Sequence, residues 1–539
     1  MSNLNELDWN PVSTKTLFEL LAALPDEDVL SVSGDAIIHA PVVENADHVQ
    51  RDGVFVARAG RSVDGHDLIP QAIANGAAAV IGSKPLSELG EIGVPYAQLR
   101  DPQAALGWLA AAYYDYPSRD LVMIGVTGTD GKTTTSTLIH SILKLATGGT
   151  AGYISTIAAD LGSTTADTGL HVTTPSAPDV QMYLAQMRDN GLTHCVLEMT
   201  SHGLAQGRLN GVDLDMAVMT NVTHEHLDYH GSWENYRDAK GIMFDLLSRS
   251  QKKSGVRVPQ AFEESTPEAL IPKIAIVNAD DASAAYFAAK AADQVVTYGI
   301  ENEADFRATN IRYEPGRTFF NAAGDAYFTS LAGAFNVYNC LAAIAAARSY
   351  GANLATVQTG LANVKSVSGR MQRIDEGQNF TAIVDFAHTP NALKQALNAA
   401  RTILPEGKRL ISVFGSAGLR DVEKRRMMAE TSQEYADFTV LTAEDPRTES
   451  LDEILQMMAE GCISRGGVEG ETFIRVPDRG QAIYEACQMA QAGDIVIVCG
   501  KGHEQSMCFG SIEYPWDDRD ATRAALRGEP LRTLPTAQA

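Results

Sequence analysis

The fold of this chain is decided by one stretch, Gly125-Val126-Thr127-Gly128-Thr129-Asp130-Gly131-Lys132-Thr133. An apolar run, Leu121 to Ile124, precedes it, and apolar residues at helical spacing follow it from Leu138 to Leu143. This order predicts a strand, a glycine-rich turn and a helix. The backbone N–H groups of such a turn can bind phosphate oxygens, and the helix dipole favours the same anion.

The same stretch predicts a site for a nucleoside triphosphate. Lys132 would reach the β- and γ-phosphates, and the hydroxyl of Thr133 would ligate Mg²⁺. The pattern G-x-x-x-x-G-K-[ST] is broken at one position, because Val126 stands where the first glycine belongs. The strand before the turn and the helix after it support the interpretation, so we expect ATP as a ligand.

Composition excludes several classes of protein. A formal net charge of −24 argues against non-specific binding to nucleic acids or to anionic membranes. No apolar run approaches the roughly 20 residues of a membrane-spanning helix, and the first residues lack the pattern of a secretory signal. The 6 cysteines are scattered without a C-x-x-C pair, which is typical of reduced, buried thiols. We expect a cytoplasmic, monomeric protein with no nucleic-acid or membrane partner.

The chain alternates apolar runs with helical patterns, which predicts an α/β fold. A length of 539 residues suggests three or four domains. Boundaries near Tyr116–Ser118 and Val364–Gly369 divide it into an N-terminal domain (1–117), a central ATP-binding domain with a parallel sheet (118–364) and a C-terminal Rossmann-like domain (365–539). We expect an exposed insertion at 251–272 and a frayed tail at 533–539.

Polar residues follow several predicted strands. Glu198 ends one of them, where a carboxylate could hold Mg²⁺ or could be an ordinary loop residue. The segment 221–231 packs three histidines and two acids together, which favours metal or phosphate chemistry over a plain surface loop. Lys240 lies in an amphipathic helical pattern, and by composition it is a surface lysine. Three polar loops in the last segment, at 385–390, 444–447 and 500–504, predict a second ligand site at one sheet edge.

Taken together, these motifs resemble the Mur ligases, most closely the type that forms the muramoyl tripeptide (MurE type). The resemblance runs from about Asp52 to Asp520. The motifs that carry it are 128–134, Thr173-Thr174-Pro175, Glu198 with Ser201-His202-Gly203, His226-Leu227-Asp228, Ala239-Lys240, 333–339, Gly369-Arg370-Met371, 385–390 and 500–504.

The resemblance implies a reaction. ATP would phosphorylate the side-chain carboxylate of UDP-N-acetylmuramoyl-L-alanyl-D-glutamate, and the amine of a diamino acid would attack the acyl phosphate. The diamino acid would be L-lysine, L-ornithine or meso-diaminopimelate, and the product a peptidoglycan precursor. Domain closure should exclude water from the intermediate.

It also implies roles for the matching residues. Those expected at ATP are Gly128, Thr129, Asp130, Gly131, Lys132, Thr133, Thr134, Asn336, Asn339, Arg370, Asp385 and His388. Those expected at the muramoyl peptide are Thr173, Thr174, Ser201 and Arg208, and those at the incoming amino acid are Arg420, Asp445, Arg447, Gly500 and Glu504. Thr133, Glu198, His226 and a carbamylated Lys240 would hold metal, and Lys132, Glu198, His226 and Lys240 would serve catalysis.

The chain departs from the family pattern at four places. Asn45-Ala46-Asp47 stands where Asp-Ser-Arg is usual, so the usual uridine-nucleotide contacts are in question. Asp130 replaces Asn or Lys, and Phe386 replaces Tyr. In Glu444-Asp445-Pro446-Arg447, the arginine favours diaminopimelate, whereas Asp445 would welcome a side-chain ammonium. These two clues conflict, and we lean slightly towards a diamino acid with a free ammonium.

Two other interpretations compete with a peptidoglycan ligase. A folylpolyglutamate- or cyanophycin-type ligase is one, and the segment Gly53–Gly82 argues against it. A nucleotide-binding regulatory or scaffold protein without turnover is the other. The presence of Lys132, Glu198, His226 and Lys240 argues against that reading.

Overall fold

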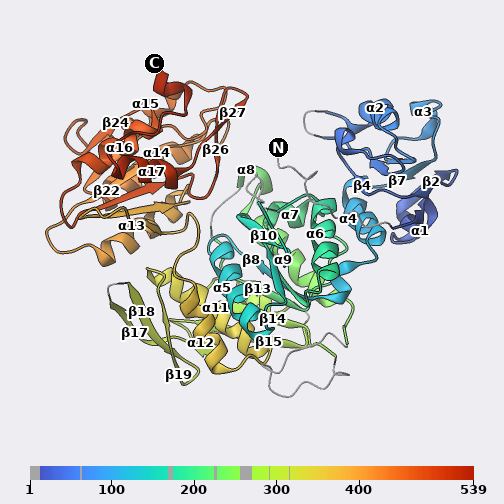
Figure 1. The fold of residues 1–539 in the computed structure, drawn as a ribbon, viewed down its shortest axis with the longest axis horizontal. Coiled ribbons are helices and arrows are strands. Elements are labelled where there is room, and N and C mark those ends of the chain that lie inside the picture. Colours follow the sequence, from blue (N-terminus) through green and yellow to red (C-terminus); the bar gives the residue numbers. More distant parts are fainter. Residues whose placement is uncertain are drawn as a thin grey trace.

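The computed structural model describes residues 13–60, 63–167, 174–223, 227–254, 270–290, 292–314 and 316–538. Three α/β parts follow one another along the chain, each built on its own sheet (Figure 1). The predicted α/β fold with three domains is confirmed, including the parallel central sheet and the Rossmann-like C-terminal sheet. The exact domain boundaries stay predictions.

The N-terminal sheet is mostly parallel. Its strands, in spatial order, are β2 (Val29–Ser33), β7 (Tyr96–Leu99), β6 (Ala79–Gly82), β5 (Val54–Val56) and β4 (Val42–Val43), of which β2 pairs antiparallel. A short pair, β1 (Lys15–Thr16) with β3 (Ile37–Ile38), lies beside α1 (Leu17–Leu21). The other helices of this part are α2 (Ile69–Ala74), α3 (Leu86–Leu89) and α4 (Pro102–Tyr113). Both β5 and β6 are buried throughout, as parallel strands covered on both faces are.

The central sheet has nine described strands. In spatial order they are β11 (Thr165–Asp167), β10 (Ala158–Asp160), β9 (Ala151–Ile154), β12 (His194–Glu198), β8 (Val122–Thr127), β13 (Met216–Met219), β14 (Ile274–Asn278), β15 (Gln294–Gly299) and β16 (Phe306–Arg307). All pairs are parallel except those of β10. The helices are α5 (Lys132–Ala146), α6 (Ala177–Asp189), α7 (Ser201–Ala205), α8 (Leu227–His230), α9 (Trp233–Arg249), α10 (Ala284–Ala288), α11 (Ala334–Ser349) and α12 (Leu354–Asn363).

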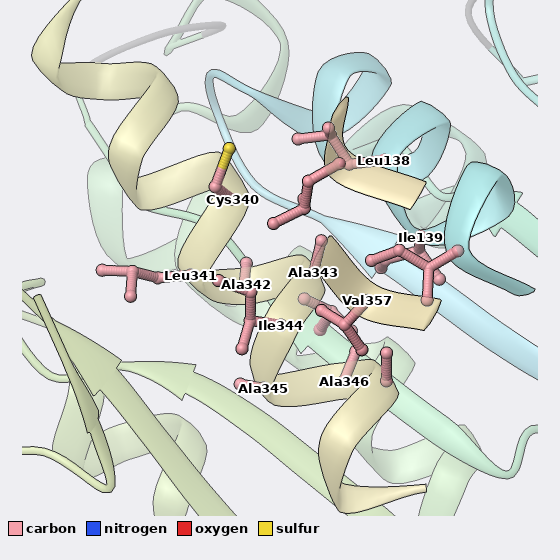
Figure 2. Close-up of a cluster of buried hydrophobic side chains, with 14 of the residues drawn as sticks. Leu138, Ile139, Cys340, Leu341, Ala342, Ala343, Ile344, Ala345, Ala346 and Val357 are labelled. Atoms are coloured by element: carbon pink, nitrogen blue, oxygen red, sulfur yellow. The ribbon is translucent and has the colours of Figure 1, made fainter. Parts of the chain in front are cut away.

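Side-chain alternation on β8 builds the two cores of this domain. Ile124 and Val126 point to one face, where α5, α11 and α12 pack, and Met123 points to the other, as does Leu121 just before the strand. Figure 2 shows Leu138 and Ile139 of α5 against the alanine-rich stretch of α11 and Val357 of α12. Small side chains on α11 let the three helices approach closely, so the helix that follows the phosphate loop is firmly seated.

A small antiparallel sheet follows the central one: β17 (Thr309–Glu314), β18 (Arg317–Ala322) and β19 (Asp325–Thr329). The C-terminal sheet runs β20 (Gln372–Ile374), β21 (Thr381–Asp385), β25 (Ile495–Cys499), β22 (Leu410–Phe414), β23 (Phe438–Leu441) and β24 (Phe473–Arg475), parallel except for β20. A hairpin and five helices complete it: β26 (Ser506–Phe509), β27 (Ile512–Pro515), α13 (Pro390–Ile403), α14 (Glu423–Tyr435), α15 (Leu451–Ser464), α16 (Arg479–Met489) and α17 (Asp518–Leu526).

Two local expectations are wrong in part. In the 251–272 segment, Lys253 and Ile271 are buried, because Lys253 Nζ lies 2.5 Å from Asp215 Oδ2 and Ile271 packs into the core, whereas Gln251, Lys252, Ser254 and Leu270 are exposed as expected; residues 255–269 lie outside the described part. The tail is not frayed at its start, since Leu534 is buried in the C-terminal core. Within the described part of the chain, no helix has both the length and the apolar character needed to cross a membrane.

Candidate functional site

The phosphate loop lies between β8 and α5 and needs glycine at two positions. Gly128 and Gly131 have φ values of 152° and 82°. An added Cβ would lie 1.8 Å from Thr220 Oγ1 at Gly128, and 2.2 Å from Asn339 Oδ1 at Gly131. The loop backbone is therefore packed so tightly that any side chain at these positions would displace its supports.

Residues that follow β13 hold the loop in shape. The backbone N–H of Thr129 donates to Asn221 O at 2.8 Å, and that of Asp130 donates to Asn221 Oδ1 at 2.9 Å. Thr220 Oγ1 donates to Asp130 O at 2.6 Å. The loop is thus preorganised by its neighbours, which lowers the cost of ordering it around a ligand.

Lys132 folds over this loop. Its Nζ donates to the carbonyl oxygens of Gly128, at 3.0 Å, and Thr129, at 2.7 Å. Thr134, two residues further along α5, is buried. The ammonium of Lys132 therefore lies against the backbone at the start of α5, where phosphate oxygens are expected.

Glu198 and Thr133 meet at the start of α5. Glu198 is only 2% exposed, and its Oε1 and Oε2 accept from Thr133 Oγ1 at 3.2 and 3.1 Å. The N–H of Thr156 also donates to Oε2, at 3.1 Å. A buried carboxylate beside the loop hydroxyl fits Mg²⁺, which takes oxygen ligands and uses one or two carboxylates with phosphates and water. Among the residues described, no group of three or more His, Cys, Asp or Glu gathers as a metal cage.

Lys240 is buried, so the expectation of a surface lysine is wrong. It is 1% exposed, and its Nζ donates to Gly128 O at 2.6 Å and lies 4.3 Å from the centre of the Tyr236 ring. Tyr236, which sequence reasoning missed, donates through its hydroxyl to Thr129 Oγ1 at 3.1 Å. The amphipathic pattern predicted that Tyr236 and Lys240 lie on one helix, four residues apart. It could not predict that this helix, α9, packs against the phosphate loop.

Two asparagines of α11 approach α5. Thr135 Oγ1 donates to Asn339 Oδ1 at 3.3 Å, and Asn339 Nδ2 donates to Asn336 Oδ1 at 2.9 Å. Arg370 reaches the same region from the linker to the C-terminal domain, with Nη2 3.5 Å from Thr133 Oγ1. This places a guanidinium at the phosphate loop, 237 residues from Thr133 in the chain.

Asp385 and His388 lie around the linker rather than directly on the loop. Asp385 accepts from the N–H groups of Met371, at 2.6 Å, and Ala387, at 2.8 Å, and burial raises the pKa of its carboxyl group. His388 Nδ1 lies 3.0 Å from Phe386 O. The Phe386 ring in turn lies 4.4 Å under the Arg370 guanidinium, so this group orients Arg370.

A second group surrounds Thr174. Thr174 Oγ1 and Thr200 Oγ1 are 2.8 Å apart, and Arg208 Nη1 donates to Thr174 O at 2.8 Å. Ser201 begins α7 and is buried beside them. Three residues expected at the muramoyl peptide thus come together, while Thr173 and His226 lie outside the described residues.

A third group lies at the carboxyl edge of the C-terminal sheet. Asp445 accepts from Lys501 Nζ at 3.0 and 3.1 Å and from Cys508 N at 3.0 Å, and Lys501 also pairs with Glu504. Arg447 donates through Nη1 to Gly418 O at 3.2 Å. Gly500 follows β25 at this edge, whereas Arg420 is exposed on the loop after Leu419.

The side chain of Asp445 is held by contacts inside the protein, which the sequence interpretation did not assign to it. Its partner Lys501 is shared with Glu504, so one ammonium faces two carboxylates. The choice of diamino acid stays a prediction.

Three family models match successive parts of the chain. Residues 45–114, 126–347 and 369–502 match, respectively, the Mur ligase family catalytic domain, the Mur ligase middle domain and the Mur ligase glutamate ligase domain. A UDP-N-acetylmuramoyl-L-alanyl-D-glutamate–2,6-diaminopimelate ligase of Geobacillus thermodenitrificans is 39% identical over 89% of this chain and 93% of its own. The chain belongs to the Mur ligase family.

A further relative and a solved structure also belong to this family. A UDP-N-acetylmuramyl-tripeptide synthetase of Roseiflexus sp. is 40% identical to this Mur ligase, over 90% of this chain and 94% of the relative. A solved structure of a UDP-N-acetylmuramoyl-L-alanyl-D-glutamate–2,6-diaminopimelate ligase superposes with a TM-score of 0.59 at 29% identity, covering 90% of this chain and 94% of the other. The predicted family and the prediction of a ligase are confirmed.

One more solved structure supports the fold alone. The MurF ligase of Thermotoga maritima in complex with ADP superposes with a TM-score of 0.61 at 19% identity, over 91% of this Mur ligase and 97% of the other chain. The roles assigned to single residues stay predictions.

Proposed function

We propose that this Mur ligase joins meso-diaminopimelate to UDP-N-acetylmuramoyl-L-alanyl-D-glutamate, with ATP and Mg²⁺, as a step of peptidoglycan precursor synthesis in the cytoplasm. The observation that carries the proposal is the meeting of Lys132, Thr133 and Glu198 at the phosphate loop, in a chain whose relatives are named as ligases of this reaction.

The residues at the loop suit phosphoryl transfer to a carboxylate. A carboxylate is a poor electrophile, and its conversion to an acyl phosphate supplies a good leaving group for attack by an amine. The backbone N–H groups at the start of α5 and the ammonium of Lys132 would bind the phosphates of ATP. Arg370, held over Phe386 and 3.5 Å from Thr133 Oγ1, would add a second cation beside the phosphates.

Mg²⁺ fits the oxygen atoms of Thr133 and Glu198. When bound there, it would offset the charge of the transferring phosphoryl group. Lys240 lies within hydrogen-bond distance of the loop carbonyl of Gly128. We propose that a carbamate on Lys240 makes this position anionic and contributes a further metal ligand, together with His226.

Arg447 supports diaminopimelate as the amino acid. Its guanidinium can form two parallel hydrogen bonds with the distal carboxylate of diaminopimelate. Lysine and ornithine have no such carboxylate. Asp445, the residue that favoured an ammonium, is held inside the protein by Lys501 and by the N–H of Cys508. Several relatives are named 2,6-diaminopimelate ligases.

The direct test is product analysis. The purified protein is incubated with ATP, Mg²⁺, diaminopimelate and UDP-N-acetylmuramoyl-L-alanyl-D-glutamate, and the products are separated and weighed by mass spectrometry. We expect ADP and a nucleotide tripeptide in equal amounts. The acceptor without D-glutamate is the control, and it should give neither product. Equal ADP formation with both acceptors would contradict the proposal, because it would be uncoupled hydrolysis.

A further inference from the structure

A small open hollow lies where the N-terminal sheet and α4 face the central domain. Its lining includes Glu44, Arg58 and Gln103 from the N-terminal side and Gln206 and Arg208 from the central side. Arg208 is expected at the muramoyl peptide, whereas the resemblance to the Mur ligases implies no role for Glu44 or Arg58.

Strand pairing explains why Glu44 and Arg58 meet. Strands β4 and β5 are parallel neighbours, with Val43 opposite Phe55. Glu44 and Arg58 follow the carboxyl ends of these strands, and ligands of open α/β sheets bind at that edge. Arg58 Nε lies 2.5 Å from Glu44 Oε2, and the two side chains remain 36% and 24% exposed. The pair is therefore within reach of a ligand in the hollow.

The charges in the hollow do not balance. Two guanidinium groups, of Arg58 and Arg208, face one carboxylate, that of Glu44. Arg208 is partly buried, and its Nη1 donates a hydrogen bond to the carbonyl oxygen of Thr174 at 2.8 Å. Burial lowers the pKa of the Arg208 guanidinium, Glu44 opposes that shift and Arg58 adds to it, so the three groups are close enough to interact.

The other acid of the same loop does not restore the balance. Asp47 accepts from Gln71 Nε2 of α2 at 2.5 Å, and its N–H is bound by Asn45 Oδ1 at 3.0 Å. Its carboxylate thus serves the neighbouring helix. Among the side chains that line the hollow, the positive charges exceed the negative ones by one, in a chain whose net charge is −24.

We propose that Arg58 and Arg208 together bind an anionic group of the nucleotide-peptide substrate, and that Glu44 holds Arg58 in place until this anion displaces it. The proposal rests on the proposed function, which supplies a substrate with a diphosphate and with carboxylates. A guanidinium binds either oxyanion through two parallel hydrogen bonds. Because the two arginines come from different domains, the same contact would tie the N-terminal domain to the central one when substrate binds.

The test is calorimetric binding of UDP-N-acetylmuramoyl-L-alanyl-D-glutamate to the full-length protein. Arg58→Ala should weaken binding about 10- to 100-fold, the range expected for lost hydrogen bonds between charged groups. The affinity of Arg58→Lys should lie between those of Arg58→Ala and the unmodified protein, because an ammonium keeps the charge but cannot form two parallel hydrogen bonds. The matched control is Arg51→Ala, which removes the same charge from a 91% exposed side chain and should leave the affinity unchanged. Unchanged ADP binding and melting temperature verify the fold of each variant.

Shorter ligands identify the anion. If UDP alone also loses affinity in Arg58→Ala, the group is the diphosphate. If Arg58→Ala loses affinity only for the ligand that contains D-glutamate, the group is a carboxylate. Glu44→Gln should bind at least as tightly as the unmodified protein, and binding as weak as that of Arg58→Ala would overturn the role given to Glu44.

Two results would overturn the inference as a whole, and they are distinguishable. If the unmodified protein binds the nucleotide dipeptide and Arg58→Ala binds it equally well, Arg58 has no part in recognition. If the unmodified protein binds none of the ligands, the proposed function fails and the inference with it.

Discussion

Thr133 Oγ1 lies 3.1 Å from Glu198 Oε2, although the two residues are 65 positions apart in the chain. The parallel register of β8 and β12, with Val126 opposite Glu198, brings the carboxylate to the end of the strand that leads into the phosphate loop. The hydroxyl and the carboxylate thus form one oxygen-rich corner beside the start of α5. This corner is the structural basis for the predicted Mg²⁺ site.

Glu198→Gln should abolish most turnover while the fold persists. The amide keeps the size of the side chain but removes the charge that would attract Mg²⁺. We expect phosphate release to fall by about 100-fold or more, the size of effect typical for a lost electrostatic contact in catalysis. Glu88→Gln, on the exposed side of α3, is the control and should keep full turnover. Normal turnover of Glu198→Gln would remove Glu198 from the metal site.

Lys240→Ala should also lose turnover, and short carboxylates such as acetate should restore part of it. The reason is that a carbamate would be an anion, which an added carboxylate can replace in the space left by the shortened side chain. Turnover is measured with and without acetate in the variant and in Lys252→Ala, an exposed control. Full activity of Lys240→Ala without any addition would contradict the carbamate role.

Asp518→Asn should destabilise the C-terminal domain strongly. Asp518 binds Arg479 through two contacts of 2.7 Å, and both side chains are 0% exposed. The substitution leaves the buried guanidinium without a counter-charge, which costs about 3–5 kcal/mol. Urea unfolding of the variant should show this loss, and Asp520→Asn, on the exposed face of the same helix, should change stability by less than about 0.5 kcal/mol. Equal stability of the two variants would show that the pair contributes little.

Glu444 should make stability depend on pH. Burial raises the pKa of its carboxyl group to about 7, although the Lys424, Arg479 and Lys501 cations act in the opposite direction. Between the unfolded pKa, about 4.5, and 7, the folded state keeps a proton that the unfolded state releases. The contribution of this group to the free energy of unfolding therefore falls as the pH rises through this window, by up to about 3 kcal/mol.

Glu444→Gln imitates the neutral form and should remove this dependence. Near pH 5 the variant and the unmodified protein should unfold at similar urea concentrations. At pH 8 the variant should be the more stable one. A stability difference that does not change between these two pH values would show that Glu444 does not titrate in this range.

Much of the fold follows from local sequence. Runs such as 216–219 and 410–414 are apolar throughout, and they form β13 and β22 because parallel strands covered on both faces have no polar side. The strand β17 was not predicted, since Thr309 to Glu314 is mostly polar and exposed. Its place depends on pairing with β18, which no local pattern reveals.

The candidate site was likewise predictable from the sequence only in part. The phosphate loop is contiguous, so its residues were predictable from spacing. The burial of Lys240 and the contact of Lys501 with Asp445 join segments 112 and 56 residues from their partners, so only the folded chain shows them. The pair of Glu44 and Arg58 likewise depends on the register of β4 and β5.

The most direct test of the central claim is phosphate release with ATP, Mg²⁺ and UDP-N-acetylmuramoyl-L-alanyl-D-glutamate, with meso-diaminopimelate, L-lysine and L-ornithine supplied in parallel. The account predicts release that depends on diaminopimelate and that Arg447→Ala largely removes. Release with lysine or ornithine in preference to diaminopimelate, or no release with any of the three, would contradict it.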